Sequence, residues 1–163
     1  MKRCIEQLIY QLKEVQKGNP WIGSSYKKKL EVLSDEDFFR RPLKDVHSVA
    51  ELISHLTIWR KETALKIKTG RGSITDSDPS NWREIGLLRG IGRQRILKDY
   101  DDSLQEIIEL LSDKQDEFLE KKYYDNDFRG DYTYSWLLNG MLHHDLYHLG
   151  QIGYIVKFLH KPE

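Results

Sequence analysis

Two histidines stand one helical turn apart near the end of the chain, in the stretch HHDLYHLGQI at residues 143–152. On a helical wheel at about 100° per residue, His144 and His148 fall in the middle of an apolar stripe, whereas His143 and His160 fall off it. Side chains at positions i and i+4 converge on one point. A shared divalent metal ion would satisfy both imidazoles, because neutral imidazole is the commonest protein ligand for such ions. The alternative is a pair of core histidines, each hydrogen-bonded to a neighbour.

Two ligands are too few for a tight site, and two further histidines are candidates for a third. His55 falls near the apolar face of a predicted helix at 48–68, where it can point into a helical bundle. His47 precedes the start of that helix, and we expect it to pack over the helix end rather than bind metal. Three imidazoles leave a coordination position open for water or for a substrate thiolate or carboxylate. This donor set favours a catalytic or substrate-binding site and suits zinc, nickel, copper, iron or cobalt.

Four long stretches with helical periodicity must position these side chains. Apolar residues recur at spacings of three and four over residues 5–15, 48–68, 78–111 and 133–159. Ser48 and Glu51 form a capping box at the start of the second helix, and Asp78 suits an N-cap of the third. The pattern therefore predicts an all-α protein, a four-helix bundle.

The connectors between these helices differ in length and character. The first, of about 30 residues, carries short helical pieces (SYKKKLEVL and SDEDFFRR) and is long enough for a parallel crossover after the first helix. The segment TGRGSITDSDPSN is a loop by composition, and residues 112–131 form a second polar connector without a strand pattern.

The composition fits one globular domain over residues 1–163. The 26 basic and 26 acidic residues leave no sustained basic face, so nucleic acid is not an expected partner. No apolar run reaches the ~20 residues that a membrane span needs, and the N-terminus lacks the features of a secretory signal. Cys4 is the sole cysteine and cannot form an intrachain disulfide, which favours a cytoplasmic location.

Three stretches together resemble a known family and cover most of the chain in the right order. HHDLYHLGQIGYI is similar to the last-helix motif of the DinB/YfiT-like superfamily of metalloenzymes, H-x-x-x-H-x-G-Q. HSVAELISHLTIW resembles the second-helix signature of that family, which carries its first histidine ligand. NPWIGSSYKKKLEVLSDEDFFRRP resembles the early connector of the family. The last-helix motif is fairly specific, and the other two stretches support it.

The resemblance implies a four-helix bundle with a long crossover after the first helix, often a homodimer. It also implies a divalent metal ion, usually nickel or zinc, held by His55, His144 and His148. Gln151 matches the glutamine of the motif, with packing beside the site as its alternative role. Characterised members include transferases and isomerases that use low-molecular-weight thiols such as bacillithiol or mycothiol, whereas many members have no assigned activity.

Three functional hypotheses follow. In the first, the chain is an enzyme in which a metal-bound thiolate attacks an electrophilic small molecule, or in which the metal activates water for hydrolysis. Trp59 and Trp82 would then wall the pocket, although core packing also explains a tryptophan; Glu62 is expected to be a solvated carboxylate rather than a base. The second hypothesis is a non-enzymatic, dimeric metal- or ligand-binding bundle in stress response. The third is an ordinary bundle without a metal.

Overall fold

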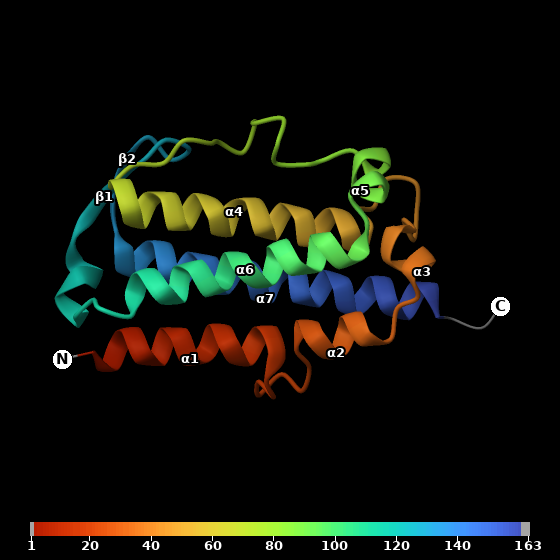
Figure 1. Ribbon diagram of the computed structural model, residues 1–163, viewed down its shortest axis with the longest axis horizontal. Coiled ribbons are helices and arrows are strands. Elements are labelled where there is room, and N and C mark those ends of the chain that lie inside the picture. Colours follow the sequence, from red (N-terminus) through yellow and green to blue (C-terminus); the bar gives the residue numbers. More distant parts are fainter. Residues whose placement is uncertain (1, 161–163) are drawn as a thin grey trace.

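Four long helices form the frame of the computed structural model, which describes residues 2–160 (Figure 1). Met1 and residues 161–163, the ends of the predicted domain, lie outside the described residues. The long helices are α1 (Arg3–Lys17), α4 (Val49–Thr69), α6 (Arg93–Leu111) and α7 (Tyr134–Leu159). They pack lengthwise around an apolar core, which confirms the predicted all-α four-helix bundle.

The two helices that carry the candidate histidines are α4 and α7, and both start at caps. The Ser48 hydroxyl accepts from the Glu51 backbone N–H, and the Glu51 carboxylate accepts from the Ser48 backbone N–H. This reciprocal pair satisfies two donors that a helix start otherwise leaves free, so the predicted capping box is confirmed. Thr133 caps α7 by accepting from the Trp136 N–H. Both helix starts therefore agree with the sequence analysis.

The third predicted helix is broken in the structure. Instead of one helix over 78–111 there are α5 (Ile85–Ile91) and α6, separated by Gly92 at a φ of 84°. A positive φ suits glycine, which has no Cβ, and it interrupts the helical path. Asp78 is not an N-cap, because its carboxylate accepts instead from the backbone and the hydroxyl of Ser80 in a turn. The prediction of one continuous helix with that cap was therefore wrong.

The long connection after the first helix is present and carries the two short helices α2 (Tyr26–Glu31) and α3 (Asp35–Phe39). It does not make α1 and α4 parallel: α2 leads the chain on beyond the end of α1 before the chain turns back into α4 (Figure 1). The helices α4 and α6 run in one direction, and α1 and α7 run in the opposite direction (Figure 1). Segment 70–92 crosses back along the bundle from the end of α4 to the start of α6, and α4 and α6 can therefore run in the same direction.

A small β-hairpin, which the sequence analysis missed, closes the end of the bundle where α4 ends and α7 begins (Figure 1). After the 3-10 helix η1 (Asp116–Glu120), strand β1 (Lys122–Asp125) pairs antiparallel with β2 (Gly130–Thr133). The chain just after α4 joins it, because the Tyr124 N–H donates to the Gly70 carbonyl and the Gly72 N–H to the Tyr124 carbonyl. These bonds tie the crossing segment to the hairpin. No helix within residues 2–160 has the length and apolarity needed to cross a membrane.

Candidate metal centre

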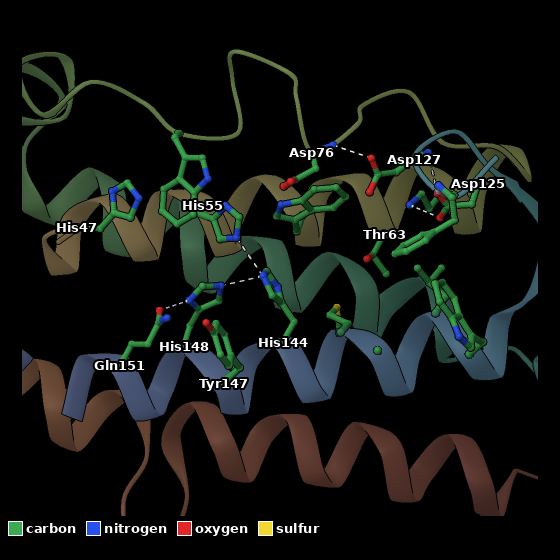
Figure 2. Close-up of a pocket in the computed structure, with 18 residues that line it drawn as sticks. His47, His55, Thr63, Asp76, Asp125, Asp127, His144, Tyr147, His148 and Gln151 are labelled. Carbon is green, nitrogen blue, oxygen red and sulfur yellow. Dashed lines mark hydrogen bonds and ion pairs between the residues drawn. The ribbon is translucent and has the colours of Figure 1, made fainter. Parts of the chain in front are cut away.

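His55 on α4 meets His144 and His148 on α7 in the interior of the bundle (Figure 2). The Nε2 atom of His144 lies 3.0 Å from Nε2 of His55 and 2.9 Å from Nε2 of His148. One ligand atom from each of the three residues lies within 4.8 Å of the other two. The structure thus brings together the three histidines that the sequence analysis singled out, from helices about 90 residues apart.

Outer hydrogen bonds fix the orientation of two of these rings. Nδ1 of His55 lies 3.3 Å from the carbonyl oxygen of Asn81, and Nδ1 of His148 lies 2.7 Å from Oε1 of Gln151. Each of these oxygens accepts a hydrogen bond, so Nδ1 carries the proton and Nε2 of the same neutral ring carries a lone pair. Two such lone pairs therefore face Nε2 of His144. Such outer partners are how metal-ligating histidines are usually held.

The surroundings keep these imidazoles neutral. Burial, followed by the proximity of His148, lowers the pKa of His55 to about 4. Burial and the two neighbouring rings lower the pKa of His144 to about 3. Burial also lowers the pKa of His148, against the opposing effect of its bond to Gln151. Neutral imidazole is the form that binds metal, so the three rings match the requirements of a divalent cation without losing protons first.

Hydrogen-bond donors are scarce among the three converging Nε2 atoms. Three neutral Nε2 atoms hold at most one shared proton, the one on His144, because the Nδ1 bonds of His55 and His148 place their protons elsewhere. One N–H cannot satisfy both facing lone pairs with good geometry. A cation at the point where the rings meet would satisfy all three, so the residues present fit a divalent metal ion.

The remaining histidines stand apart from this cluster. His47 stacks on Trp82, with ring centroids 3.8 Å apart, and Trp82 stacks in turn on His55 at 4.0 Å. His47 thus packs over the start of α4 as expected, and it supports Trp82 beside His55. His143 and His160 are exposed, which agrees with their place off the apolar stripe.

Glu62 is neither a solvated carboxylate nor a partner of the histidines. It is 4% exposed and accepts from the backbone and hydroxyl of Ser73 and from the Ile74 N–H. The expectation of a surface residue was therefore wrong. Helical periodicity indicates on which side of the helix the Glu62 side chain lies. It does not indicate that the crossing segment covers this side chain. Glu62 anchors that segment to α4.

A cavity of about 600 Å³ opens beside the histidines. Trp59 and Trp82 line it, as the enzyme hypothesis expected, and Gly140 leaves open space on the α7 side. The crossing segment supplies Asp76 to its wall (Figure 2), and the hairpin supplies Phe128. A volume of this size admits a small organic molecule. The three imidazoles therefore face a space that a substrate could enter.

Several residues that shape the site have no signature in the sequence. Asn81 is 1% exposed, and its backbone carbonyl orients His55. Its side-chain oxygen accepts a hydrogen bond from Trp59 Nε1, and its side-chain amide donates to Asp76. A lone asparagine in a loop segment is an ordinary turn residue. Only Gln151 could have been anticipated, because it lies one turn beyond His148 on the same face.

Comparison with models of known protein families identifies the family of this chain. The model of the DinB superfamily matches residues 24–152, most of the chain. The chain belongs to the DinB superfamily. The matched range contains all of α4, most of α7 and all three clustered histidines. No curated protein matches the sequence.

Two solved structures from Bacillus subtilis share the fold of this DinB-superfamily chain. A DinB-like protein, YjoA, is 15% identical with a TM-score of 0.66, over 96% of this chain and 94% of its own. YfiT, described as a probable metal-dependent hydrolase with an unusual four-helix bundle topology, is 14% identical with a TM-score of 0.57, over 97% of this chain and 87% of its own. At such identities the likeness shows the fold alone.

Proposed function

We propose that this chain is a divalent-metal-dependent enzyme acting on a small molecule, with His55, His144 and His148 as the metal ligands. One observation carries the proposal: three neutral imidazoles converge through Nε2 at the edge of a cavity large enough for an organic substrate. A purely structural zinc site would usually be closed by four protein ligands. Cys4, the sole cysteine, is exposed at the start of α1 and does not belong to this cluster.

The residues of the chain have separate tasks in this proposal. A bound divalent ion would supply Lewis acidity and would lower the pKa of a water or thiol at its open position. Asn81 and Gln151 would hold His55 and His148 with their Nε2 lone pairs toward the ion. Trp59 and Trp82 would exclude bulk water from one side of the cavity and position the substrate.

Hydrolysis is the first candidate reaction. YfiT, which shares the fold, is described as a probable metal-dependent hydrolase. Transfer of a low-molecular-weight thiol to an electrophile is the second candidate. The aromatic lining beside the histidines supports it, because water-poor surroundings favour a soft sulfur nucleophile. The family resemblance also leads us to propose that the metal ion is nickel or zinc and that the chain forms a homodimer.

The test is the metal content of untagged protein, purified without nickel resin and measured by elemental mass spectrometry. We expect about one divalent ion per chain in the wild type and in His143→Ala, an exposed matched control. His144→Ala and His148→Ala should each lose the ion. Wild-type protein that takes up no metal would overturn the proposal. Metal held equally by both variants would overturn the ligand assignment.

Metal-loaded wild type would then be offered ester and amide substrates, and separately electrophiles with thiols. Turnover that His148→Ala abolishes would support the enzyme. Stoichiometric metal without access of small thiols or anions to the ion would favour the non-enzymatic alternative. Perturbation of the Co²⁺ visible spectrum by added thiol measures that access directly.

A further inference from the structure

The end of the cavity away from Gln151 is rich in carboxylates. Three of the residues that line the cavity are aspartates, Asp76, Asp125 and Asp127, against one ammonium group, that of Lys66. Lys66 is already neutralised, since its Nζ lies 2.8 Å from Oδ2 of Asp125 and 3.9 Å from Oε1 of Glu62. Two negative charges, on Asp76 and Asp127, therefore remain without a cation in the cavity wall.

Asp76 and Asp127 are locked side by side by the fold. The Asp76 N–H donates to Oδ1 of Asp127 over 2.8 Å, and Oδ1 of Asp76 accepts from the side-chain amide of Asn81 over 2.9 Å (Figure 2). The second carboxylate oxygen of each residue has no partner within residues 2–160. Asp76 is exposed and Asp127 is half-buried, and a cation bound beside them would be attracted by both carboxylates.

Thr63 supplies an independent sign of a ligand. It is 4% exposed, it lines the same cavity, and its hydroxyl has no hydrogen-bond partner in the described part of the chain (Figure 2). Thr57 and Thr69 on the same helix donate to the carbonyls of Ile53 and Leu65, one turn back. Unlike the hydroxyls of Ser25 and Ser54, which are buried without a partner, the Thr63 hydroxyl oxygen is not fully buried. Thr63 instead presents its hydroxyl to the cavity, as expected for a group that hydrogen-bonds a bound molecule.

Aromatic rings complete this part of the cavity. Phe128 and Trp136 meet edge to face, with centroids 5.1 Å apart, and both line the cavity together with Trp59. Aromatic faces attract organic cations and pack against apolar bodies. Carboxylates alone would suit many cations, but carboxylates beside aromatic rings suit an organic one.

We propose that this cavity binds an organic amine, with its ammonium group at Asp76, Asp127 and the Thr63 hydroxyl and its apolar or aromatic body against Phe128 and Trp136. That this amine is the substrate rests on the proposed metal-dependent function. That it binds does not, because none of these five residues is a candidate metal ligand.

The experiment measures the binding of three isosteric probes to chelator-treated protein by calorimetry and tryptophan fluorescence. The probes are phenethylammonium, 2-phenylethanol and phenylacetate at neutral pH. We expect phenethylammonium to bind roughly tenfold more tightly than the alcohol, and phenylacetate to bind most weakly. Added salt should reduce the preference for the ammonium.

The variants Asp76→Asn and Asp127→Asn keep the oxygens that accept the structural hydrogen bonds and remove only the charge. Together they should abolish the preference for phenethylammonium, and Thr63→Val should weaken it severalfold. Asp131→Asn, an exposed aspartate outside the cavity, is the matched control and should bind like the wild type. Equal affinity for ammonium and alcohol, tighter binding of phenylacetate, or a preference that survives the double variant would overturn the inference.

The same titration on His144→Ala separates the two proposals. An unchanged preference for phenethylammonium in that variant supports the amine site whatever the metal content proves to be. Stoichiometric metal in the wild type without any preference among the probes would leave the metal centre in place and remove the amine site.

Discussion

The three-histidine cluster and the Arg60–Asp145 pair are neighbouring polar groups that join α4 to α7 inside the same bundle. Arg60 is fully buried, and its guanidinium donates to Asp145 over 2.7 Å, to Gln16 over 2.6 Å and to Tyr100 over 3.0 Å. The positive charge of Arg60 therefore meets a negative charge and hydrogen-bond acceptors that the chain itself supplies. The histidine cluster instead gathers three bases and no charge.

This difference separates a structural polar cluster from a binding site. Burying a polar group is costly unless its partners are present. Arg60 and Asp145 are paired with each other by opposite charge, although Nε of Arg60 and Oδ1 of Asp145 have no partner within residues 2–160. His55, His144 and His148 instead orient lone pairs toward one another. The Glu51 carboxylate at the start of α4 belongs to the first kind, because Arg41 and Ser48 donate to it. The variants below test this division.

The largest effect is expected from Arg60→Met. It leaves the fully buried Asp145 carboxylate without its cation, which should lower the free energy of unfolding by about 3–5 kcal/mol. Urea denaturation followed by circular dichroism measures the loss. The double variant Arg60→Met/Asp145→Leu should recover a large part of it, since replacing a whole buried pair by apolar residues is often near neutral. A single variant as stable as the wild type would show that the pair is not structural.

Glu51→Gln is expected to have the next largest effect, with a defined pH dependence. Burial raises the pKa of Glu51, but hydrogen bonds from Arg41 and Ser48 outweigh it and lower that pKa from 4.5 to about 2. The stabilisation is therefore present above pH 4.5 and is lost as pH falls through about 2. At neutral pH the variant should be about 3 kcal/mol less stable than the wild type.

Denaturation curves at a series of pH values from neutral to acid check this prediction. The difference between Glu51→Gln and the wild type should shrink steadily below pH 4.5. Glu36→Gln, at an exposed glutamate, is the control and should follow the wild type throughout. A stability difference that is the same at all pH values would mean that shape rather than charge matters at Glu51.

Zinc or nickel should stabilise the wild type and not His148→Ala. At a free metal concentration of about 100 times Kd, the expected gain is about 2.7 kcal/mol. Thermal melts with and without metal measure it. Arg60→Met should show the same gain as the wild type from its lower starting point, because it keeps all three imidazoles. An equal gain in His148→Ala would assign the ion to another place.

Gln151→Ala gives the smallest expected effect. The variant removes the acceptor that orients Nδ1 of His148, so metal affinity should fall about 10- to 100-fold while the metal-free stability changes little. Competition with a chromophoric chelator measures the affinity. Gln105→Ala, on the exposed face of α6, is a matched control. Unchanged affinity in Gln151→Ala would reduce Gln151 to a packing role.

The sequence alone predicted the bundle and named all three histidines of the cluster. Apolar spacing and the capping box at Ser48 are local signals, and they located α4 and α7 closely. The i, i+4 spacing of His144 and His148 fixes their shared face whatever the rest of the fold does. His55 could be nominated because it lies on the inner flank of a helix with a clear period. These predictions held because short-range geometry decides them.

The cavity and the supports of the histidines could not be predicted in this way. They come from segment 70–92 and from the hairpin, whose strands of four residues each are too short for a clear alternation. Backbone bonds between Gly70, Gly72 and Tyr124, some 50 residues apart, bring Asp76 to Asp127. Glu62 was misjudged for the same reason. Every residue type except proline offers the same backbone donor and acceptor, so such bonds leave no pattern in the sequence. The sequence therefore determined which helices carry the imidazoles. Only the tertiary structure decided what surrounds them.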